Sequence, residues 1–362
     1  MTVFAHPEFD DHEVVHEACD PVTGLKTIIA IHSTVLGPAA GGCRRWQYAD
    51  SRDALTDVLR LSRGMTYKNA IAGLPFGGGK AVILAEPGVP ATEDMYRAFG
   101  RIVDSLGGRY ITAEDVGMSV GAMEYIADET SHVTGRAVQG DAAGGDPSPW
   151  TALGVFLGIE AAVKARLQRD SVKGLHIAVQ GVGNVGFNLC KLLHEAGATL
   201  TVADVNAANL DRAVSAFGAS VADPSEILFM DVDVVAPCAL GHLFDETNIG
   251  DVKAPVIAGG ANNQLGVEAD GERLRDRGIL YAPDYVINGG GIICVHHEHQ
   301  GTSTSADVRA DVERIPGRLT QIFERAVNEN RATNDVANDM ARAIVAAGRE
   351  QATRQTKEAL SA

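Results

Sequence analysis

Apolar residues along this chain follow two alternating patterns. Short apolar runs typical of buried strands are separated by segments in which apolar residues recur every three or four positions, as on one face of a helix. The strand-like runs lie at 25–36, 81–85, 109–112, 174–180, 199–203, 232–236, 256–258 and 278–281. The helix-like segments lie at 51–62, 92–106, 151–167, 184–196, 305–323 and 333–344. This alternation predicts an α/β fold whose second part is a doubly wound sheet.

Individual side chains mark where helices begin or bend. Ser51, Thr92 and Ser119 precede helix-like segments and are expected to cap them. Pro316 lies inside the 305–323 segment and predicts a kink there, because proline removes a backbone donor.

One stretch divides the chain. Residues 140–149 are rich in glycine, proline and aspartate and carry no periodic apolar signal, which is typical of a linker between domains. The whole chain of 362 residues is also longer than one core usually supports. We therefore predict a first domain over 1–139, a second over 140–330, and a C-terminal helix over 331–362 that packs back on the first domain.

The second domain contains a dinucleotide-binding pattern. Gly181, Gly183 and Gly186 follow an apolar run and precede a helix-like segment, and Asp204 ends the next run. Such glycines bring backbone N–H groups and a helix N-terminus to a pyrophosphate, and the acid binds the adenosine ribose. Asp204 would repel a 2′-phosphate, and residues 205–206 offer no arginine to bind one. The pattern favours NAD over NADP, with a similar fold that binds no cofactor as the alternative.

Further cofactor contacts are expected where parallel strands end, since ligands bind at that edge of a doubly wound sheet. The expected cofactor-binding residues are Gly181, Gly183, Asn184, Val185, Gly186, Asp204, Cys238 and Ala239. Asn262 and Asn288 are candidates to face the nicotinamide end, and ordinary Asx turns explain them equally well.

Two lysines twelve residues apart are the candidate chemical centre of the first domain. Lys80 follows three glycines, Gly77 to Gly79, and Lys68 lies upstream. Glycines permit unusual backbone conformations and close approach of other groups. A lysine that is partly desolvated, or lies beside a second ammonium, has a lowered pKa and can act as a base. A flexible surface turn with two solvated lysines is the alternative.

An acid follows the run at 109–112. Asp115 and Glu114 both lie in the loop at its end, where a carboxylate is well placed for chemistry. Capping of the helix that starts near Ser119 is the structural alternative.

Composition narrows the functional classes. The formal net charge of −16 argues against sequence-independent binding to nucleic acid. The absence of a long apolar run and of a basic, apolar N-terminus predicts no membrane span and no signal peptide. Five scattered cysteines without a Cys-x-x-Cys pair predict a reduced, cytoplasmic protein without disulfides or zinc.

A run of histidines near the C-terminal side invites a metal interpretation. Residues 296–299 read His-His-Glu-His. Neighbouring side chains in a loop do not converge easily on one ion. We therefore expect a solvated loop between the domains and no metal site.

Taken together, the motifs resemble the Glu/Leu/Phe/Val amino acid dehydrogenases, most closely the leucine, valine and phenylalanine branch. The blocks that carry the resemblance are 37–42, 65–68, 75–80, 112–116, the glycine pattern at 181–186, and 260–264. It implies a substrate and oligomerisation domain followed by a Rossmann-type NAD domain. It also implies a homo-oligomer that catalyses reversible, NAD-dependent oxidative deamination of an L-amino acid to a 2-oxo acid and ammonia.

The resemblance assigns roles to matching positions. Lys80 matches the lysine that activates water, Asp115 the acid that moves a proton to and from the amine, and Lys68 the lysine that pairs with the substrate carboxylate. The other matching positions are Gly41, Gly42, Met65 and Asn262 toward the substrate, and Thr151 and Asn288 near the nicotinamide carboxamide.

The substrate side chain is argued from three positions. Ala40 stands where glutamate enzymes of the family carry a lysine, so a distal charge would be unpaired and costly to bury. Ala113 resembles the leucine type, whereas Ile292 is bulky. Leucine, valine or isoleucine is expected first, with phenylalanine or tryptophan as the alternative. An inactive NAD-sensing protein and a hydroxy-acid dehydrogenase are the more distant hypotheses.

Overall fold

The computed structural model describes residues 2–138 and 140–361, and the chain forms two compact units. Unit 1 comprises the chain up to Asp146, the segment Cys294–Ser305 and the chain from Ala341 onward. Unit 2 comprises Pro147–Ile293 and Ala306–Met340. The α/β class predicted from the alternating pattern is confirmed.

The units differ from the predicted domains in three segments, one of which is 331–340, predicted to pack on the first domain but part of unit 2. The division falls after Asp146 rather than after residue 139, and Cys294–Ser305 belongs to unit 1 although the pattern placed it in the second domain. The helix α9 (Gly290–Gln300) contains the change from one unit to the other. Helical periodicity shows that a segment buries one face, but it carries no information about which core receives that face.

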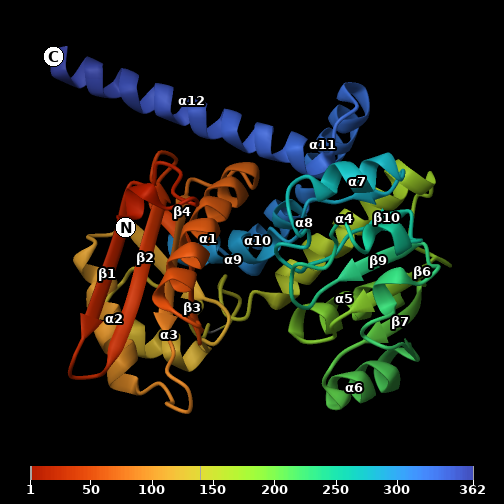
Figure 1. Ribbon diagram of the computed structural model, residues 1–362, viewed down its shortest axis with the longest axis horizontal. Helices are drawn as coiled ribbons and strands as arrows, with labels where there is room; N and C mark the ends of the chain where they lie inside the picture. Colours follow the sequence, from red (N-terminus) through yellow and green to blue (C-terminus); the bar gives the residue numbers. More distant parts are fainter. Residues whose placement is uncertain (1, 139, 362) are drawn as a thin grey trace. The chain divides into compact units, whose positions relative to one another are not determined.

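Unit 1 is built on a five-stranded mixed sheet (Figure 1). Its strands, in spatial order, are β1 (Val14–Asp20), β2 (Leu25–Ser33), β4 (Gly77–Leu84), β3 (Ala39–Trp46) and β5 (Tyr110–Glu114). β2 pairs antiparallel with β1 and β4, whereas β3 is parallel to both β4 and β5. β1 and β3 were not predicted, and β4 starts four residues before the predicted run. Glycine, arginine and histidine dilute the apolar signal in these strands, and pairing with neighbours defines them instead.

One long helix covers one face of this sheet. The helix α1 (Ser51–Ile71) packs through Ala54, Val58 and Leu59 against the sheet. Its N-cap is Asp50, whose carboxylate accepts from two backbone N–H groups, so the prediction that Ser51 is the cap was wrong by one residue. The helix continues well past the predicted end and carries the Met65–Lys68 block.

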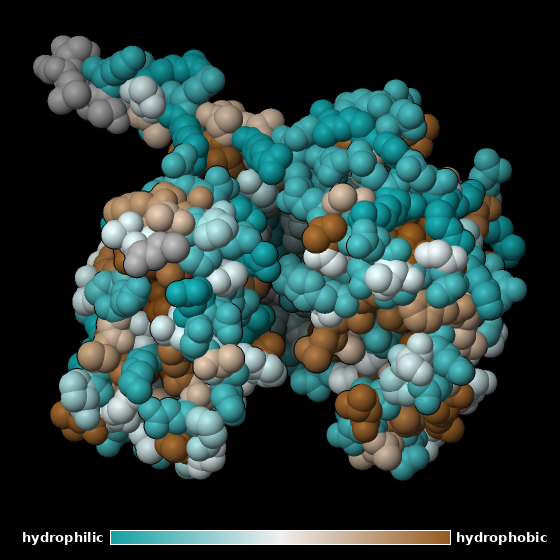
Figure 2. Space-filling view, in the orientation of Figure 1, coloured by the Kyte–Doolittle hydropathy of each residue, from teal (hydrophilic) through white to brown (hydrophobic). Residues whose placement is uncertain are grey.

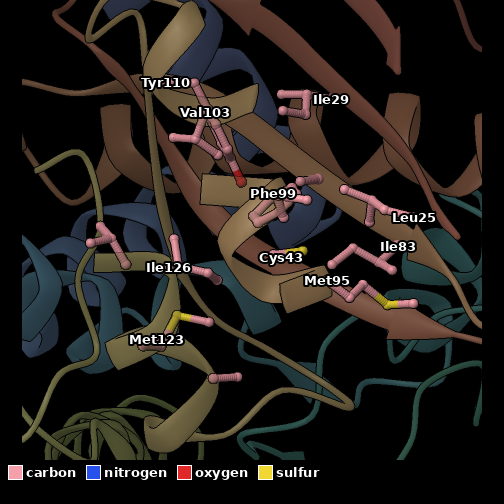
Figure 3. Close-up of a cluster of buried hydrophobic side chains, with 14 of the residues drawn as sticks. Leu25, Ile29, Cys43, Ile83, Met95, Phe99, Val103, Tyr110, Met123 and Ile126 are labelled. Carbon is pink, nitrogen blue, oxygen red and sulfur yellow. The ribbon is translucent and has the colours of Figure 1, made fainter. Parts of the chain in front are cut away.

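Two helices cover the opposite face. They are α2 (Glu93–Ser105) and α3 (Val120–Ala127), with Thr92 and Ser119 as their N-caps, as predicted. Figure 3 shows the core between them and the sheet, where Phe99 and Val103 of α2 and Met123 of α3 pack with Ile29. The sheet of unit 1 is therefore buried on both faces.

Two more helices contribute to unit 1. Within α9, the Glu298 carboxylate accepts hydrogen bonds from the backbone N–H groups of Gly135 and Arg136, both at distances near 3 Å. The helix α12 (Thr333–Ser361) starts where the sequence predicted. From Ala341 onward it belongs to unit 1, where Arg342 Nε donates to the Tyr67 hydroxyl at 3.2 Å.

Unit 2 is a doubly wound, fully parallel sheet of six strands with helices around it (Figure 1). The strands in spatial order are β11 (Leu280–Tyr281), β10 (Val256–Ile257), β9 (Val234–Pro237), β6 (His176–Gln180), β7 (Thr199–Ala203) and β8 (Ser220–Val221). The helices are α4 (Ser148–Leu167), α5 (Asn184–Glu195), α6 (Ala207–Phe217), α7 (Asp270–Asp276), α8 (Asp284–Ile287), α10 (Ser305–Val312) and α11 (Ile315–Glu329). Most of α10 and all of α11 belong to this unit.

The segment with Pro316 is two helices rather than one kinked helix. α10 ends at Val312, and Pro316 lies in the first turn of α11. A first-turn proline costs no hydrogen bond, because its missing N–H would have no partner within the helix. The predicted kink is therefore wrong, and the proline starts a new helix.

The surface is largely polar. On the face shown in Figure 2, hydrophilic residues cover most of the surface. Large exposed apolar residues such as Val22, Val205 and Leu240 are scattered along the chain, as is normal for a globular protein. No helix within residues 2–138 and 140–361 is long and apolar enough to cross a membrane.

Glycines control how closely β3, β4 and α1 approach. A Cβ on Gly78 would lie 2.1 Å from the backbone nitrogen of Thr66 in α1, and one on Gly41 would lie 1.9 Å from the Gly79 carbonyl oxygen. Gly77, Gly78 and Gly79 are part of β4, and none has a positive φ. The predicted close approach is therefore present, whereas the unusual backbone conformation is not.

We predict that Gly78→Ala lowers the free energy of unfolding by about 1–3 kcal/mol, because the new methyl group forces α1 away from β4. Gly64→Ala is the matched control in the same helix, since nothing lies within 4 Å of its Cβ position. Alanine at that site should stabilise the helix by up to about 1 kcal/mol. Urea denaturation measures both, and equal stability of Gly78→Ala and the wild type would contradict the packing argument.

Candidate active site

A buried lysine and a neighbouring aspartate form the centre of the candidate site in unit 1. Lys80 lies on β4, and its side chain is 8% exposed. Asp115 follows β5 directly, and its Oδ2 is 2.5 Å from Lys80 Nζ. The alternative of two solvated lysines in a turn is therefore wrong, since Lys80 belongs to a strand and is paired. Asp115 does not cap α3 either, because the Ser119 hydroxyl accepts from Ala122 N.

Strand alternation explains why these two side chains meet. Val82, two residues from Lys80, packs on the α1 face of the sheet, so Lys80 points to the same face. Tyr110 belongs to the opposite core, which places Ala113 and Asp115 on the α1 face as well. The strand β3 lies between β4, which carries Lys80, and β5, which Asp115 follows. Gly42 of β3 pairs with Ala113 of β5, so a residue without a side chain separates the lysine from the acid.

Charge determines the ionisation of the site. Burial alone would raise the pKa of Asp115, but the positive charges of Lys80 and Arg44 outweigh it and hold that pKa below its ordinary value. Burial raises the pKa of the neighbouring Cys43 thiol and that of the Tyr110 phenol, so both groups are neutral. The carboxylate and the cations around it are therefore the charged groups at this point of the sheet.

Glycines line the sheet between the lysine and the acid. A Cβ on Gly42 would lie 2.8 Å from the Cβ of Asp115, so no larger residue fits there without moving the acid. The buried Tyr110 hydroxyl donates to the Gly41 carbonyl at 2.7 Å and fixes the backbone of β3. Asn69 Nδ2 donates to the Gly77 carbonyl at 2.6 Å and ties α1 to the start of β4.

The predicted substrate residues of unit 1 lie on the sheet that carries the Lys80–Asp115 pair and on the helix that covers it. Ala40 is fully buried on β3, Ala113 is nearly so on β5, and both lie on the α1 face. Met65 and the half-buried Lys68 lie on the last turns of α1, and Met65 Cγ is 3.0 Å from the Cβ position of Gly41. These residues therefore lie on β3, on β5 and on the last turns of the helix α1, which packs on the sheet face that carries Lys80.

A buried pair of histidines supports the same stretch of α1. His32 Nδ1 of β2 is 2.8 Å from Thr66 Oγ1, and the His12 ring packs on that of His32 with centroids 4.9 Å apart. Burial, followed by the nearby His12, lowers the pKa of His32 to about 4. Burial also lowers the pKa of His12. Both rings are therefore neutral at pH 7 and act as hydrogen-bonding and packing groups.

The glycine pattern of unit 2 has the geometry of an anion cradle. Gly181 has φ +85°, and a Cβ on Gly186 would lie 1.9 Å from the Gly181 carbonyl oxygen, so both positions require glycine. Gly183 is the N-cap of α5, and no side chain accepts a hydrogen bond from the first N–H groups of this helix. Nothing lies within 4 Å of the Cβ position of Gly183. The first N–H groups of α5, starting at Asn184 and Val185, are thus available to a phosphate.

Asp204 follows β7 as expected. Its carboxylate accepts from Val182 N and Asn206 N, both at 2.8 Å, which holds it beside the glycine loop. Residues 205–206 carry no arginine that could bind a 2′-phosphate. Arg212 of α6 also reaches this region, since its guanidinium lies 3.8 Å from the Phe187 ring centroid and donates to the Val182 carbonyl.

Polar groups at the carboxyl edge of this sheet form a second cluster. Asn288 Nδ2 donates to Asn262 Oδ1 at 2.7 Å, and Asn288 Oδ1 is buried without a hydrogen-bond partner. The sequence pattern suggested that Asn288 follows a strand. In the structure it is instead the C-cap of the short helix α8. An orphaned buried acceptor suits a ligand that brings an N–H donor, such as a carboxamide.

The remaining residues predicted in unit 2 lie on nearby elements. Thr151 is in the first turn of α4, and its Oγ1 is 2.7 Å from the Cβ position of Gly291 in α9. Ile292 is buried on α9. Ala239 is 2.8 Å from the Cβ position of Gly181, and burial raises the pKa of the Cys238 thiol to about 11. These contacts surround the glycine loop and the Asn288 cluster.

The histidine-rich segment is not a solvated loop. Residues 296–299 lie in α9, where His296 and His297 are buried and the His296 ring packs edge-on against Phe76, with centroids 5.1 Å apart. Across the part of the chain that the structure describes, no group of three or more His, Cys, Asp or Glu residues is arranged to hold a metal ion.

Several residues of the site carried no role in the sequence interpretation. Arg44 Nε lies 3.5 Å from Asp115 Oδ2. Asn69 and Tyr110 bind backbone carbonyls of β4 and β3, and His32 contacts Thr66 of α1. Strand alternation would have indicated Arg44, had β3 been recognised as a strand.

Comparisons with known proteins show the family to which this chain belongs. The family model described as "Glu/Leu/Phe/Val dehydrogenase, dimerisation domain" matches residues 12–132. The one described as "Glutamate/Leucine/Phenylalanine/Valine dehydrogenase" matches residues 146–213 and 206–359. The resemblance stated from the sequence blocks is therefore confirmed.

Individual relatives match over most of their length. Leucine dehydrogenase of Bacillus subtilis is 50% identical over 324 residues, which cover 90% of this chain and 88% of the relative. L-tryptophan dehydrogenase of Nostoc punctiforme is 48% identical over 318 residues, which cover 88% of each. The crystal structure of that tryptophan enzyme matches with a TM-score of 0.79 at 44% identity, covering 94% of this chain and 97% of that one.

We predict that the buried His32 makes stability depend on pH. Its folded pKa of about 4 lies below the ordinary 6.5, so the unfolded chain binds a proton first. The free energy of unfolding therefore has its full value above pH 6.5 as far as His32 is concerned. It falls by about 3 kcal/mol as the pH drops toward 4. His32→Gln should reduce the fall in unfolding free energy between pH 7 and 5, measured by urea denaturation. His16→Gln, on the outer strand β1, controls for the loss of a histidine, and identical pH dependence in wild type and His32→Gln would refute the prediction.

Proposed function

We propose that this chain, which belongs to the Glu/Leu/Phe/Val dehydrogenase family, catalyses the reversible, NAD-dependent oxidative deamination of an apolar L-amino acid. Family membership makes it an amino acid dehydrogenase, an oxidoreductase with a nicotinamide cofactor. The observation that carries the proposal is the buried Lys80–Asp115 pair on a glycine-lined sheet face. The products are the 2-oxo acid, ammonia and the reduced cofactor.

The chemistry of unit 1 follows from its charges. The Lys68 ammonium, on the last turn of α1, pairs with the substrate carboxylate, assisted by the backbone of Gly41 and Gly42. Asp115 is held ionised and takes a proton from the substrate amine. After hydride transfer has produced the imine, Lys80 in its neutral form, having released its ammonium proton to solvent, withdraws a proton from water as the water attacks the imine carbon. Asp115 returns its proton to the nitrogen, ammonia leaves as the C–N bond breaks, and the hydroxyl proton of the carbinolamine is released to solvent as the carbonyl forms.

The residues of unit 2 suit a dinucleotide. The open Gly183 position and the uncapped start of α5 would hold the pyrophosphate, and Asp204 would bind the adenosine ribose. The orphaned Asn288 acceptor, with Thr151, would hold the carboxamide. When bound, the nicotinamide supplies the acceptor for the hydride of the substrate Cα. We propose NAD rather than NADP because Asp204 would repel a 2′-phosphate.

The preference for an apolar substrate side chain rests on three apolar residues, which offer no charge to a polar substrate. Ala40, Ala113 and Met65 are apolar, so a distal carboxylate in the substrate would meet no partner among them. Leucine, valine or isoleucine is the first proposal. The tryptophan enzyme is nearly as similar to this chain as the leucine enzyme is, which keeps an aromatic substrate as the second.

Two further proposals follow from the family. The match of residues 12–132 to a region described as a dimerisation domain supports a homo-oligomer formed through unit 1. The composition supports a cytoplasmic location, since all five cysteines are free.

We predict that the purified protein reduces NAD with leucine, valine or isoleucine, at a kcat/KM at least about tenfold above that with phenylalanine, tryptophan or glutamate. Lactate and malate should give no turnover. Absorbance at the wavelength of NADH measures each rate. NADP is tested in parallel because Arg212 donates to the Val182 carbonyl, and the N–H of Val182 binds Asp204. Preference for glutamate or for a hydroxy acid would overturn the proposal. A faster reaction with phenylalanine or tryptophan would favour the aromatic alternative.

We predict that Lys80→Ala lowers kcat by about 100- to 10,000-fold, because the general base is lost. Binding of NAD should be unchanged, since the predicted cofactor residues lie in unit 2. Isothermal titration calorimetry with NAD and steady-state kinetics separate the two effects. Lys26→Ala is the matched control, because Lys26 is paired with Glu86 at the surface of the same sheet. Wild-type turnover in Lys80→Ala would remove the catalytic assignment.

A further inference from the structure

A second cation contacts the aspartate of the candidate site. Arg44 of β3 lies two residues beyond Gly42 on the same sheet face, and its Nε is 3.5 Å from Asp115 Oδ2. Lys80 Nζ approaches that same oxygen at 2.5 Å. The carboxylate is thus held between a lysine from β4 and an arginine from β3, and both cations are largely buried.

A second carboxylate, that of Asp57, binds the other edge of the Arg44 guanidinium. Arg44 Nη1 donates to Asp57 Oδ2 of α1 at 2.9 Å, and the Tyr48 hydroxyl donates to that oxygen at 2.6 Å. Side-chain exposure is 21% for Arg44 and 25% for Asp57. A planar guanidinium with donors on two edges can bridge two carboxylates in one orientation, which an ammonium cannot do.

The next residue shows that this arrangement is specific to Arg44. Arg45 points to the other face of the strand, where its Nη2 donates to the Val89 carbonyl at 2.7 Å. Both arginines come from the same strand and have the same charge. Only Arg44 faces the candidate acid, so Arg45 is a matched control for removal of a positive charge from β3.

We propose that Arg44 is a positioning residue for the reaction. It holds the Asp115 carboxylate in place for proton exchange with the substrate amine, and Asp57 and Tyr48 anchor it. This inference rests on the proposed function, because it assigns Arg44 a role through Asp115 and no contact with substrate or cofactor. The proton transfers stay as given above: Asp115 accepts the proton of the substrate amine and returns it to the leaving nitrogen.

The charged and titratable groups around Asp115 determine the direction of the pH effect. They are Lys80 from β4, Arg44 and Cys43 from β3, Tyr48 after β3, Asp57 from α1 and Tyr110 from β5. The two cations are largely buried against the acid, and the thiol and phenols are neutral. Removing the Arg44 cation therefore makes protonation of Asp115 easier and raises the pKa of that carboxyl group.

The test compares Arg44→Met, Arg44→Lys and Arg45→Met, with Asp115→Asn as the reference, using the amino acid that the wild type turns over fastest. Arg44→Met should lower kcat at least about tenfold, leave KM for NAD unchanged, and move the acidic limb of kcat/KM upward by about one pH unit. Arg44→Lys should restore the position of the limb but only part of kcat. Arg45→Met should match the wild type within about twofold.

The outcomes separate this inference from the proposed function. A wild type that turns over no amino acid, or a fully active Asp115→Asn, would overturn both. An active wild type, an inactive Asp115→Asn and an unchanged kcat and acidic limb in Arg44→Met would overturn the role of Arg44 alone. A lower kcat without movement of the limb would also overturn it, since a merely structural role predicts that result. Should thermal unfolding show that Arg44→Met does not fold, wild-type kcat in Arg44→Lys would overturn the inference, and a reduced kcat would support it.

Discussion

The Lys80–Asp115 ion pair depends on how closely three strands and one helix approach one another. Any side chain at Gly78 would collide with α1, and any at Gly42 would displace Asp115. The strands stay close because these positions have no Cβ, and the lysine is buried because the helix lies directly on the sheet. A buried lysine needs an opposite charge at contact distance, and Asp115 supplies it. The glycines therefore serve the electrostatics of the site through packing.

Burial around this pair removes competing charges. The Cys43 thiol and the Tyr110 phenol have raised pKa values, and His12 and His32 have lowered ones, so these neighbours are neutral at physiological pH. They contribute hydrogen bonds and packing that hold β2, β3 and α1 in place. Charge is confined to groups whose partners the structure provides, which favours a defined protonation state in a low-dielectric region.

In unit 2, the groups suited to a ligand are backbone N–H groups rather than charged side chains. A dinucleotide carries negative charge along its phosphates, and the uncapped start of α5 offers backbone N–H groups without a basic side chain. The orphaned Asn288 acceptor provides a neutral contact at the same edge of the sheet. In the function proposed above, unit 1 would act through side-chain charges on a sheet, and unit 2 would act through backbone dipoles at a helix end.

Local motifs were enough to predict much of this from the sequence alone. The glycine spacing at 181–186 and the acid at Asp204 specify a strand, a turn and a helix within one short segment, and the block order indicated the family. Pairing between distant segments was not predictable, because β3 has the composition Ala-Ala-Gly-Gly-Cys-Arg-Arg-Trp and becomes a strand only between β4 and β5. The roles of Arg44, the histidine pair and the segment 294–305 depend on that pairing. Local sequence carries propensity and spacing, whereas only tertiary packing decides which face a side chain occupies and which charges share it.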